Sequence, residues 1–214
     1  MPGCMIPLIL FVFFMPVLFA IVFFNIAAIS FTKLGLSSGG ALILFMSILF
    51  GSMVNIPVSR KRYYTADSTE YQVPFLFYYP PQVRERVIAV NLGGAIIPTV
   101  FSLYLLTKAP LLQTMIATLI IVLVCKRLAR PVPGVGIKLP AFIPPLVAAL
   151  VAIILSPGNA APVAFISGVL GTLIGADLLN LHWLDDLGAQ VLSIGGAGVF
   201  DGIFLVGVVA AFLT

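Results

Sequence analysis

The stretch Ser193-Ile-Gly-Gly-Ala-Gly-Val-Phe-Asp-Gly-Ile-Phe204 places Asp201 inside an apolar segment long enough to enter a membrane. A second stretch, Val169-Leu-Gly-Thr-Leu-Ile-Gly-Ala-Asp-Leu-Leu-Asn180, does the same with Asp177. A carboxylate in hydrocarbon costs about 2.5 kcal/mol or more. Two such residues in neighbouring segments therefore predict a site, which would be a catalytic pair, a proton or ion site, or a pair of structural bonds.

The composition around these stretches is typical of a membrane protein. The 214 residues are 61% hydrophobic and only 8% charged, with a mean hydropathy of +1.21. A soluble domain carries about 25% charged residues, so this chain has too few charges to cover a surface in water. We therefore expect an all-α, polytopic transmembrane helical bundle, a single domain over residues 1–214 in the cell inner (cytoplasmic) membrane.

Seven apolar stretches are long enough, or nearly so, to cross about 30 Å of hydrocarbon. They lie at Met5–Phe31, Leu36–Pro57, Val87–Thr107, Pro110–Cys125, Pro140–Leu155, Pro162–Leu181 and Gln190–Leu213. The fourth and fifth stretches are short, so six spans with one re-entrant segment is the alternative to seven spans.

Basic residues fall mainly in two loops of this predicted bundle, which lie on the same side if there are seven spans. The loop residues are Arg60, Lys61, Arg62, Arg84 and Arg86, followed by Lys126, Arg127, Arg130 and Lys138. Only Lys33 and Lys108 fall on the other side. Because cytoplasmic loops carry an excess of Lys and Arg, we expect a multi-pass protein with its N-terminus in the cytoplasm.

Two loop segments are rich in proline. The first, residues 59–86, also holds five tyrosines, which suits the headgroup layer of a membrane, so we expect a cytoplasmic or interfacial loop. The second, residues 130–145, contains Pro140 among several prolines that no regular helix accommodates. Irregular backbone at membrane depth is tolerated when it is buried in protein or lines a watery cavity. Pro140 is thus a candidate site residue, and a purely structural entry to the fifth span is the alternative.

The triplet Gly-Gly-Ala occurs three times, at residues 39–41, 93–95 and 195–197. The last two copies lie in similar settings, Asn91-Leu-Gly-Gly-Ala-Ile-Ile-Pro98 and Ser193-Ile-Gly-Gly-Ala-Gly-Val-Phe200, which is a weak signal of duplication. Glycine pairs let helices approach closely and also loosen the local helix.

Several polar residues are expected in the cytoplasmic half or centre of the bundle. They are Asn55, Asn91, Asp177, Asn180 and Asp201. Asp177 and Asn180 are three residues apart and would share one helix face. The opposite face of that helix would pack tightly through two glycines, Gly171 and Gly175.

Glycines close to Asp201 would give its carboxylate room. They are Gly195, Gly196, Gly198 and Gly202, which we count with the candidate site. In two regular helices Asp177 and Asp201 would differ in depth by roughly 9 Å. The difference shrinks if Gly195 and Gly196 unwind the start of the last span.

Three functions remain open from these residues. Two carboxylates held close together cannot both ionise easily and share a proton. One can then activate water while the other protonates a carbonyl, which is peptidase chemistry. The same pair suits a proton- or ion-coupled carrier of small molecules, and a non-catalytic accessory subunit is the third possibility. Whether the protein is an enzyme is therefore undecided at this point.

The sequence gives little support for metal, cofactor or nucleic-acid binding. A single histidine and no paired-cysteine spacing argue against a metal, and we expect no cofactor and no nucleic-acid partner. The expected partners are the lipid bilayer and a membrane-embedded peptide or a small-molecule or ion substrate.

Five stretches resemble an uncharacterised bacterial and archaeal integral-membrane family, a domain of unknown function, over nearly the whole chain. They are Gly51-Ser-Met-Val-Asn-Ile-Pro57, Val90-Asn-Leu-Gly-Gly-Ala95, Arg130-Pro-Val-Pro-Gly-Val-Gly136, Ile174-Gly-Ala-Asp-Leu-Leu179 and Ile194-Gly-Gly-Ala-Gly-Val-Phe-Asp-Gly-Ile-Phe204. This resemblance implies a shared fold and carries no activity.

A weaker resemblance is to Gly-x-Gly-Asp intramembrane aspartyl proteases, of the presenilin and prepilin-peptidase type. That family has one aspartate in each of two neighbouring spans, which Asp177 and Asp201 match. It implies that these two residues are catalytic. Here two residues separate Gly198 from Asp201, and the nearest relative of the presenilin Pro-Ala-Leu element, Pro140-Ala-Phe142, precedes the aspartates.

Overall fold

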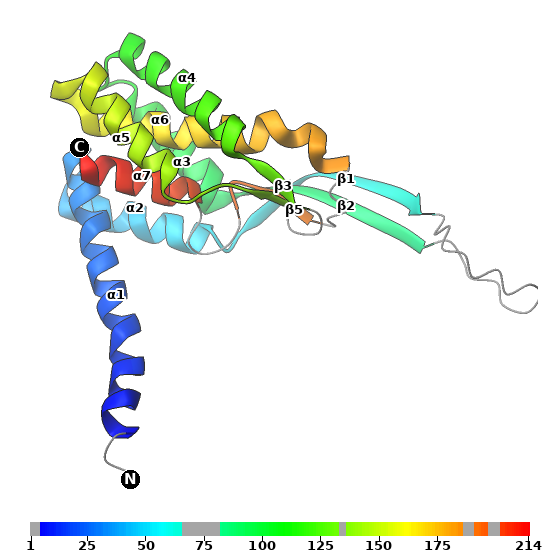
Figure 1. Ribbon diagram of the computed structural model, residues 1–214, viewed down its shortest axis with the longest axis horizontal. Helices are drawn as coiled ribbons and strands as arrows, with labels where there is room; N and C mark the ends of the chain where they lie inside the picture. Colours follow the sequence, from blue (N-terminus) through cyan, green and yellow to red (C-terminus); the bar gives the residue numbers. More distant parts are fainter. Residues whose placement is uncertain (1–4, 66–81, 133–135, 186–190, 197–201) are drawn as a thin grey trace, which may run out of the picture.

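A computed structural model describes residues 5–65, 82–132, 136–185, 191–196 and 202–214 of the chain. Its helices gather into one body, and a two-stranded ribbon extends away from that body (Figure 1). The described residues are mostly helical, as the sequence predicts, but an all-α bundle is wrong because two small sheets are also present.

The N-terminal part of the chain is helical. Helix α1 covers Met5–Lys33 and helix α2 covers Ser38–Gly51. The first half of α1 leads away from the body (Figure 1), and its second half packs against the body through Ala27 and Phe31, which are fully buried. Ser37 caps α2 by accepting a hydrogen bond from the backbone N–H of Gly40, which satisfies a donor that the first turn leaves free.

The predicted second and third spans, Leu36–Pro57 and Val87–Thr107, each contain part of a β-strand next to the loop at 59–86. Strand β1 covers Asn55–Thr65 and pairs antiparallel with β2, Gln82–Asn91, from Asn55 opposite Asn91 to Thr65 opposite Gln82. The predicted interfacial loop is therefore a β-ribbon at both ends, and residues 66–81 lie outside the described part. Strand β1 contains two tyrosines and one each of valine, isoleucine and threonine, and β2 contains three valines and one isoleucine, residues that suit a pleated surface.

Short helices follow the ribbon. A π-helical turn at Leu92–Ile96 leads into α3, Ile97–Leu105. Helix α4 covers Leu111–Leu128, and a small antiparallel hairpin follows it, with β3 at Arg130–Val132 and β4 at Gly136–Lys138. Helix α5 covers Ile143–Leu155 and begins with two prolines, which suit a first turn because their missing N–H groups need no partner there.

The longest helical column changes its geometry along its length. It runs through a 3₁₀ turn at Pro157–Asn159, helix α6 at Ala160–Thr172, a π-helical turn at Leu173–Asp177 and a 3₁₀ segment at Leu178–Asp185. Strand β5, Val191–Ile194, comes next and pairs parallel with β2. Helix α7, Gly202–Leu213, ends the chain. The predicted seventh span is thus a strand followed by a helix of only 12 residues.

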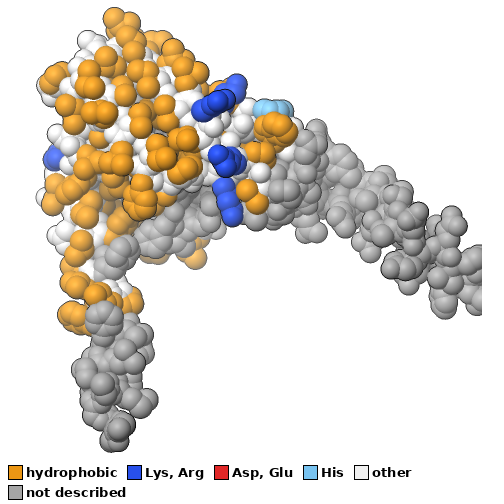
Figure 2. Space-filling view, in the orientation of Figure 1, with side chains coloured by type: hydrophobic (Ala, Val, Ile, Leu, Met, Phe, Trp, Pro, Cys, Tyr) orange, Lys and Arg blue, Asp and Glu red, His pale blue; other side chains and the backbone are white. Residues whose placement is uncertain are grey.

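Three helices are long and apolar enough to cross a membrane among the described residues. They lie at Phe14–Lys33, Leu111–Leu128 and Pro157–Trp183. Helices α2, α5 and α7 and the column Leu92–Leu105 are shorter than about 20 residues, the length that spans hydrocarbon. Seven spans are therefore not confirmed. Figure 2 shows apolar side chains over most of the visible surface of the helical body.

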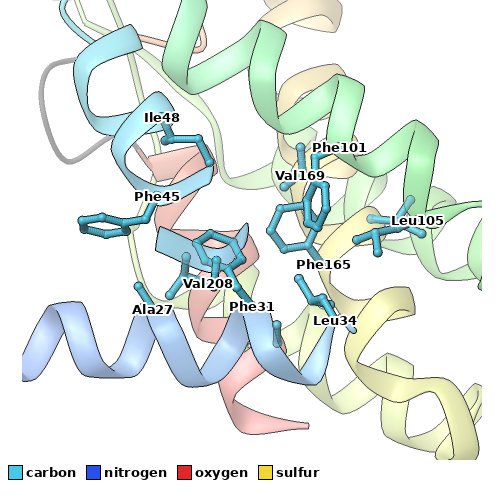
Figure 3. Packing of buried hydrophobic residues seen from close by; sticks show 13 residues of the cluster. Ala27, Phe31, Leu34, Phe45, Ile48, Phe101, Leu105, Phe165, Val169 and Val208 are labelled. Atoms are coloured by element: carbon cyan, nitrogen blue, oxygen red, sulfur yellow. The ribbon is translucent and has the colours of Figure 1, made fainter. Parts of the chain in front are cut away.

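The core is built on three phenylalanines from different helices. The ring of Phe101 lies 5.3 Å from that of Phe165 and 6.3 Å from that of Phe31, with edge-to-face geometry in both pairs. Figure 3 shows Val208, Val169 and Leu105 around them. The rings thus join α1, α3 and α6 by close packing.

Glycines allow the column of α6 to pack closely, as the sequence predicts. A Cβ atom on Gly171 would lie 2.6 Å from Ile121, and one on Gly175 would lie 2.5 Å from the carbonyl oxygen of Val122. Any larger residue would push α4 away. Helix α7 packs on the same column, where a Cβ on Gly168 would lie 2.7 Å from Val206.

Candidate functional site

Three chain segments meet at one end of the three-stranded sheet. In the parallel pair, Val90 lies opposite Ile194, so β2 and β5 end together. In the antiparallel pair, Asn55 at the start of β1 lies opposite Asn91 at the end of β2. Five residues gather here and are called the polar junction below. They are Asn55, Asn91, Asp177, Ser193 and Gly195.

Asn91 is the central buried residue of the polar junction, with 1% of its surface exposed. Its side-chain Nδ2 donates to the carbonyl oxygen of Ser52 at 2.7 Å and to Oδ1 of Asn55 at 3.1 Å. Its Oδ1 accepts from the backbone N–H of Gly94 at 2.7 Å, which caps the π-helical turn. One side chain therefore joins the end of α2, the start of β1 and the start of the helical column that leads to α3.

Ser193 extends this network to strand β5. Its hydroxyl donates to Oδ1 of Asn55, so that oxygen accepts from two side chains. Ser193 was not among the residues selected from the sequence. The signal for it was present, because Asn91 and Ser193 occupy the same place before Gly-Gly in the two repeats.

Asp177 is held at the same place by the turn after β5. It is the last residue of the π-helical turn, is partly buried, and accepts a hydrogen bond at Oδ2 from the backbone N–H of Gly195 at 2.7 Å. Within the described part of the chain Oδ1 of Asp177 has no hydrogen-bond partner. A carboxylate with one oxygen fixed and the other free can bind a water molecule or a proton.

Gly195 and Gly196 fit the polar junction only because they lack side chains. Gly195 has a φ of +72°, and a Cβ there would lie 2.6 Å from the Cβ of Ala95. A Cβ on Gly196 would lie 2.5 Å from Oγ of Ser193 and 2.8 Å from Cβ of Asn91. The unwinding that the sequence allowed at these glycines is present, since the chain turns here after a strand instead of continuing a helix.

The other predicted site residues have different positions. Asn180 is buried and donates from Nδ2 to the carbonyl oxygens of Gly175 and Ala176, each at 2.9 Å, so it satisfies groups freed by the π-helical turn of its own column. Pro140 is exposed between β4 and α5. Asp201 and Gly198 lie outside the described residues. Gly202 is the first residue of α7.

The β3–β4 hairpin lies beside strand β5. A Cβ on Gly136 would be 3.7 Å from the side chain of Leu192, an ordinary van der Waals contact. Leu139, next to Pro140, packs against the buried cluster that includes Cys125 and Ala176. The proline-rich segment is therefore anchored close to β5 and to the end of the α6 column, whereas a role for Pro140 itself stays a prediction.

Within the described ranges, no group of three His, Cys, Asp or Glu side chains could hold a metal ion. His182 lies against Trp183, with ring centroids 5.1 Å apart.

The fold and the polar junction together define a class of protein. It is a mostly helical protein with three helices that are long and apolar enough to cross a membrane, and its helical columns are interrupted where polar residues gather. Residues 49–213 match the family described as a protein of unknown function, DUF1614, and the chain belongs to this family. No curated protein and no solved structure matches the chain.

Proposed function

We propose that this chain is a multi-pass membrane protein that acts as an intramembrane aspartyl peptidase, with Asp177 and Asp201 as its catalytic pair. One observation carries the proposal. The 2.7 Å hydrogen bond from Gly195 to Asp177 ties the end of the α6 column to the segment that leads into Asp201 and α7. The turn at Gly195 takes the place of the first part of the predicted last helix, which is the interruption that an aspartyl pair requires.

The chemistry needs one proton shared between two carboxyl groups. The ionised carboxylate takes a proton from water, and the water oxygen attacks the carbonyl carbon of the scissile peptide bond. The protonated carboxyl gives its proton to the carbonyl oxygen. The tetrahedral intermediate then collapses and the C–N bond breaks. The amine leaves with a proton from the carboxyl that took it from water, and one hydroxyl of the intermediate returns its proton to the other carboxylate, which restores the pair with its one shared proton. Asp177, with Oδ1 free among the described residues, suits either role.

The sheet supports a peptide as the substrate. Strand β5 is at the edge of the sheet, in the order β1-β2-β5, and ends at Ile194, one residue before Gly195, which bonds Asp177. An extended peptide can add to a sheet edge through main-chain hydrogen bonds. A membrane-embedded peptide lying along β5 would pass next to Asp177. This reading favours a peptidase over the other functions.

A test of the pair uses cysteines in place of the aspartates. The double variant Asp177→Cys/Asp201→Cys is made in a Cys4→Ser/Cys125→Ser background and treated in native membranes with an oxidant or a short bifunctional thiol reagent. A disulfide requires Cα atoms within about 7 Å. We expect efficient linkage. Absence of linkage, in folded protein with both thiols reactive to a small maleimide, would refute the catalytic pair.

Activity is then measured on the protein in liposomes. A pool of single-span membrane peptides is incubated with wild type, Asp177→Asn and Asp201→Asn, and products are identified by mass spectrometry. We expect cleavage by wild type alone, because an amide cannot exchange the proton. Cleavage that persists in either variant would show that the aspartates are not the catalytic pair.

A second candidate is a proton- or ion-coupled carrier, and the interrupted helices favour it. Carriers place substrates at discontinuous helices near the membrane midplane. Here strands β2 and β5 pair in parallel, and along the chain each is followed by Gly-Gly and then by a helix, α3 or α7. In a carrier, Asp177→Asn abolishes proton coupling and leaves substrate exchange intact. In a peptidase, the same substitution abolishes cleavage.

A further inference from the structure

We propose that the end of α4 and the β3–β4 hairpin form a binding site for the headgroup of an anionic phospholipid. The site consists of Lys126, Arg127, Arg130 and Lys138, called the hairpin cluster below. All four side chains are exposed. Among the described residues none of them has an acidic partner. The proposal is independent of the peptidase function.

The hairpin cluster contains an unfavourable pair of charges. Arg130 and Lys138 lie directly opposite each other in the antiparallel β3–β4 ladder. Side chains in such positions point to the same face, with Cβ atoms about 5 Å apart, and like charges there repel. The hairpin has only three residues in each strand to oppose this repulsion. An anion between the two side chains would turn the repulsion into attraction.

The place of the hairpin cluster on the molecule indicates which anion it is. The outer face of α4 exposes large apolar side chains along its length, at Leu112, Met115, Leu119 and Leu123. This face ends at Lys126, which lies in the last turn of the helix. Figure 2 shows Lys and Arg side chains where the apolar surface of the body ends. A lipid whose tails lie along α4 would therefore have its headgroup at the hairpin cluster.

The chemistry of the side chains suits a phosphate. Arginine offers two parallel N–H donors to phosphate oxygens, and lysine adds a point charge. Basic clusters at the cytoplasmic boundary of membrane helices attract anionic lipids in the same way. A phosphatidylglycerol-type headgroup, with one phosphate diester, would fit between Arg130 and Lys138, and Lys126 and Arg127 would add to the attraction.

The experiment measures lipid binding by the full chain in uncharged detergent micelles. Fluorescence anisotropy follows phosphatidylglycerol with a labelled acyl chain, with unlabelled phosphatidylglycerol, phosphatidylcholine and inorganic phosphate as competitors. For Arg130→Gln/Lys138→Gln we expect affinity to fall about thirtyfold, because two charged contacts to the headgroup phosphate are lost. A matched variant, Lys33→Gln/Lys108→Gln, removes the same charge elsewhere and should change affinity less than twofold.

Several outcomes would overturn the proposal. Equal competition by phosphatidylcholine would show that the headgroup is not recognised, and competition by inorganic phosphate at equal concentration would show an anion site for free phosphate. Unchanged binding by Arg130→Gln/Lys138→Gln would exclude these residues. Should that variant fail to fold, Arg130→Lys/Lys138→Arg keeps both charges and must bind as wild type does. A loss of binding in this exchange would show that charge is not the cause.

Discussion

At the scale of single residues, the geometry of the polar junction depends on a few residues whose substitution would break hydrogen bonds or cause steric clashes. Asn91 and Gly195 lie side by side at the ends of β2 and β5, one because it makes three hydrogen bonds and the other because it has no side chain. A buried amide that is fully bonded specifies one arrangement of the chain around it, since each alternative leaves polar groups unpaired. These residues therefore position Asp177 without contacting it through their side chains.

Substitution of Gly195 should destabilise the fold. In Gly195→Ala the new Cβ meets Ala95 at 2.6 Å, and the φ of +72° is strained for alanine, so we expect a loss of about 1–3 kcal/mol. Gly39→Ala is the matched control, because a Cβ there meets nothing within 4 Å. Thermal unfolding in detergent measures both variants. Equal stability of the two would contradict the turn described here.

Substitution of Asn91 should lower the free energy of unfolding far more than substitution of an exposed asparagine. Asn91→Ala leaves the Ser52 carbonyl and the Gly94 N–H without their partner in a buried place, at about 1–3 kcal/mol for each group. Asn25→Ala, which removes an exposed side-chain bond to Ile21, should cost under about 0.5 kcal/mol. Denaturant titration compares the two. A cost for Asn91→Ala no greater than that for Asn25→Ala would refute its central role.

At the scale of elements, the interrupted helices create the place where polar groups gather. The π-helical turns at Leu92–Ile96 and Leu173–Asp177 both lie at the polar junction. Single-turn π-helices are frequent at functional sites. Backbone groups that the turns release find partners close by, as with Asn180 and the carbonyls of its own column. The glycine face of the same column holds it against α4.

Substitutions at Gly171 and Ile121, which join α6 to α4, should have non-additive effects on the free energy of unfolding. Gly171→Ala places a methyl group 2.6 Å from Ile121, and we expect a loss of about 1–3 kcal/mol from overpacking. Ile121→Ala alone leaves a cavity and also destabilises. The double variant should be more stable than the sum of both losses predicts, because the cavity takes up the methyl group. Additive losses in thermal unfolding would contradict this contact.

At the scale of the whole molecule, two groups of basic residues mark the two ends of α4, and a third group belongs to the β1–β2 ribbon. Lys108 precedes Leu111, where α4 begins, and Lys126 lies in its last turn, about 22 Å along the helix from Leu111. Lys33 belongs with Lys108, because Gly35 lies against the Lys108 side chain. We propose that the hairpin end faces the cytoplasm, in agreement with the excess of positive charge there. The cytoplasmic N-terminus predicted from the sequence stays a prediction.

Labelling of single cysteines tests this orientation. Lys108 and Lys138 are both exposed, and each is replaced by cysteine in a Cys4→Ser/Cys125→Ser background. A membrane-impermeant maleimide should label Lys108→Cys in intact cells and Lys138→Cys only after the membrane is opened. The reverse pattern would invert the orientation. Labelling of both residues from outside would show that α4 does not cross the membrane.

The sequence alone determined the helices that are long and apolar enough to cross a membrane, the distribution of the basic residues along the chain and the glycine face of α6. Each depends on composition or on local spacing, which a linear pattern records directly. The strands were missed for a physical reason. Short apolar runs such as Val87–Val90 suit a strand and a buried helix equally well, and periodicity cannot separate the two.

Tertiary structure decided which of these short apolar runs form strands and which form helices. The parallel pairing of β2 with β5 joins residues about 100 positions apart, and the bond between Asp177 and Gly195 forms only once that pairing exists. The sequence singled out Asn55, Asn91 and Asp177, and the structure brings these three residues to the same end of the sheet; their role in a site stays a prediction. Their partners, among them Ser193 and the Ser52 carbonyl, depend on strand register and on helix interruptions, which follow from contacts distant in the chain rather than from neighbouring residues.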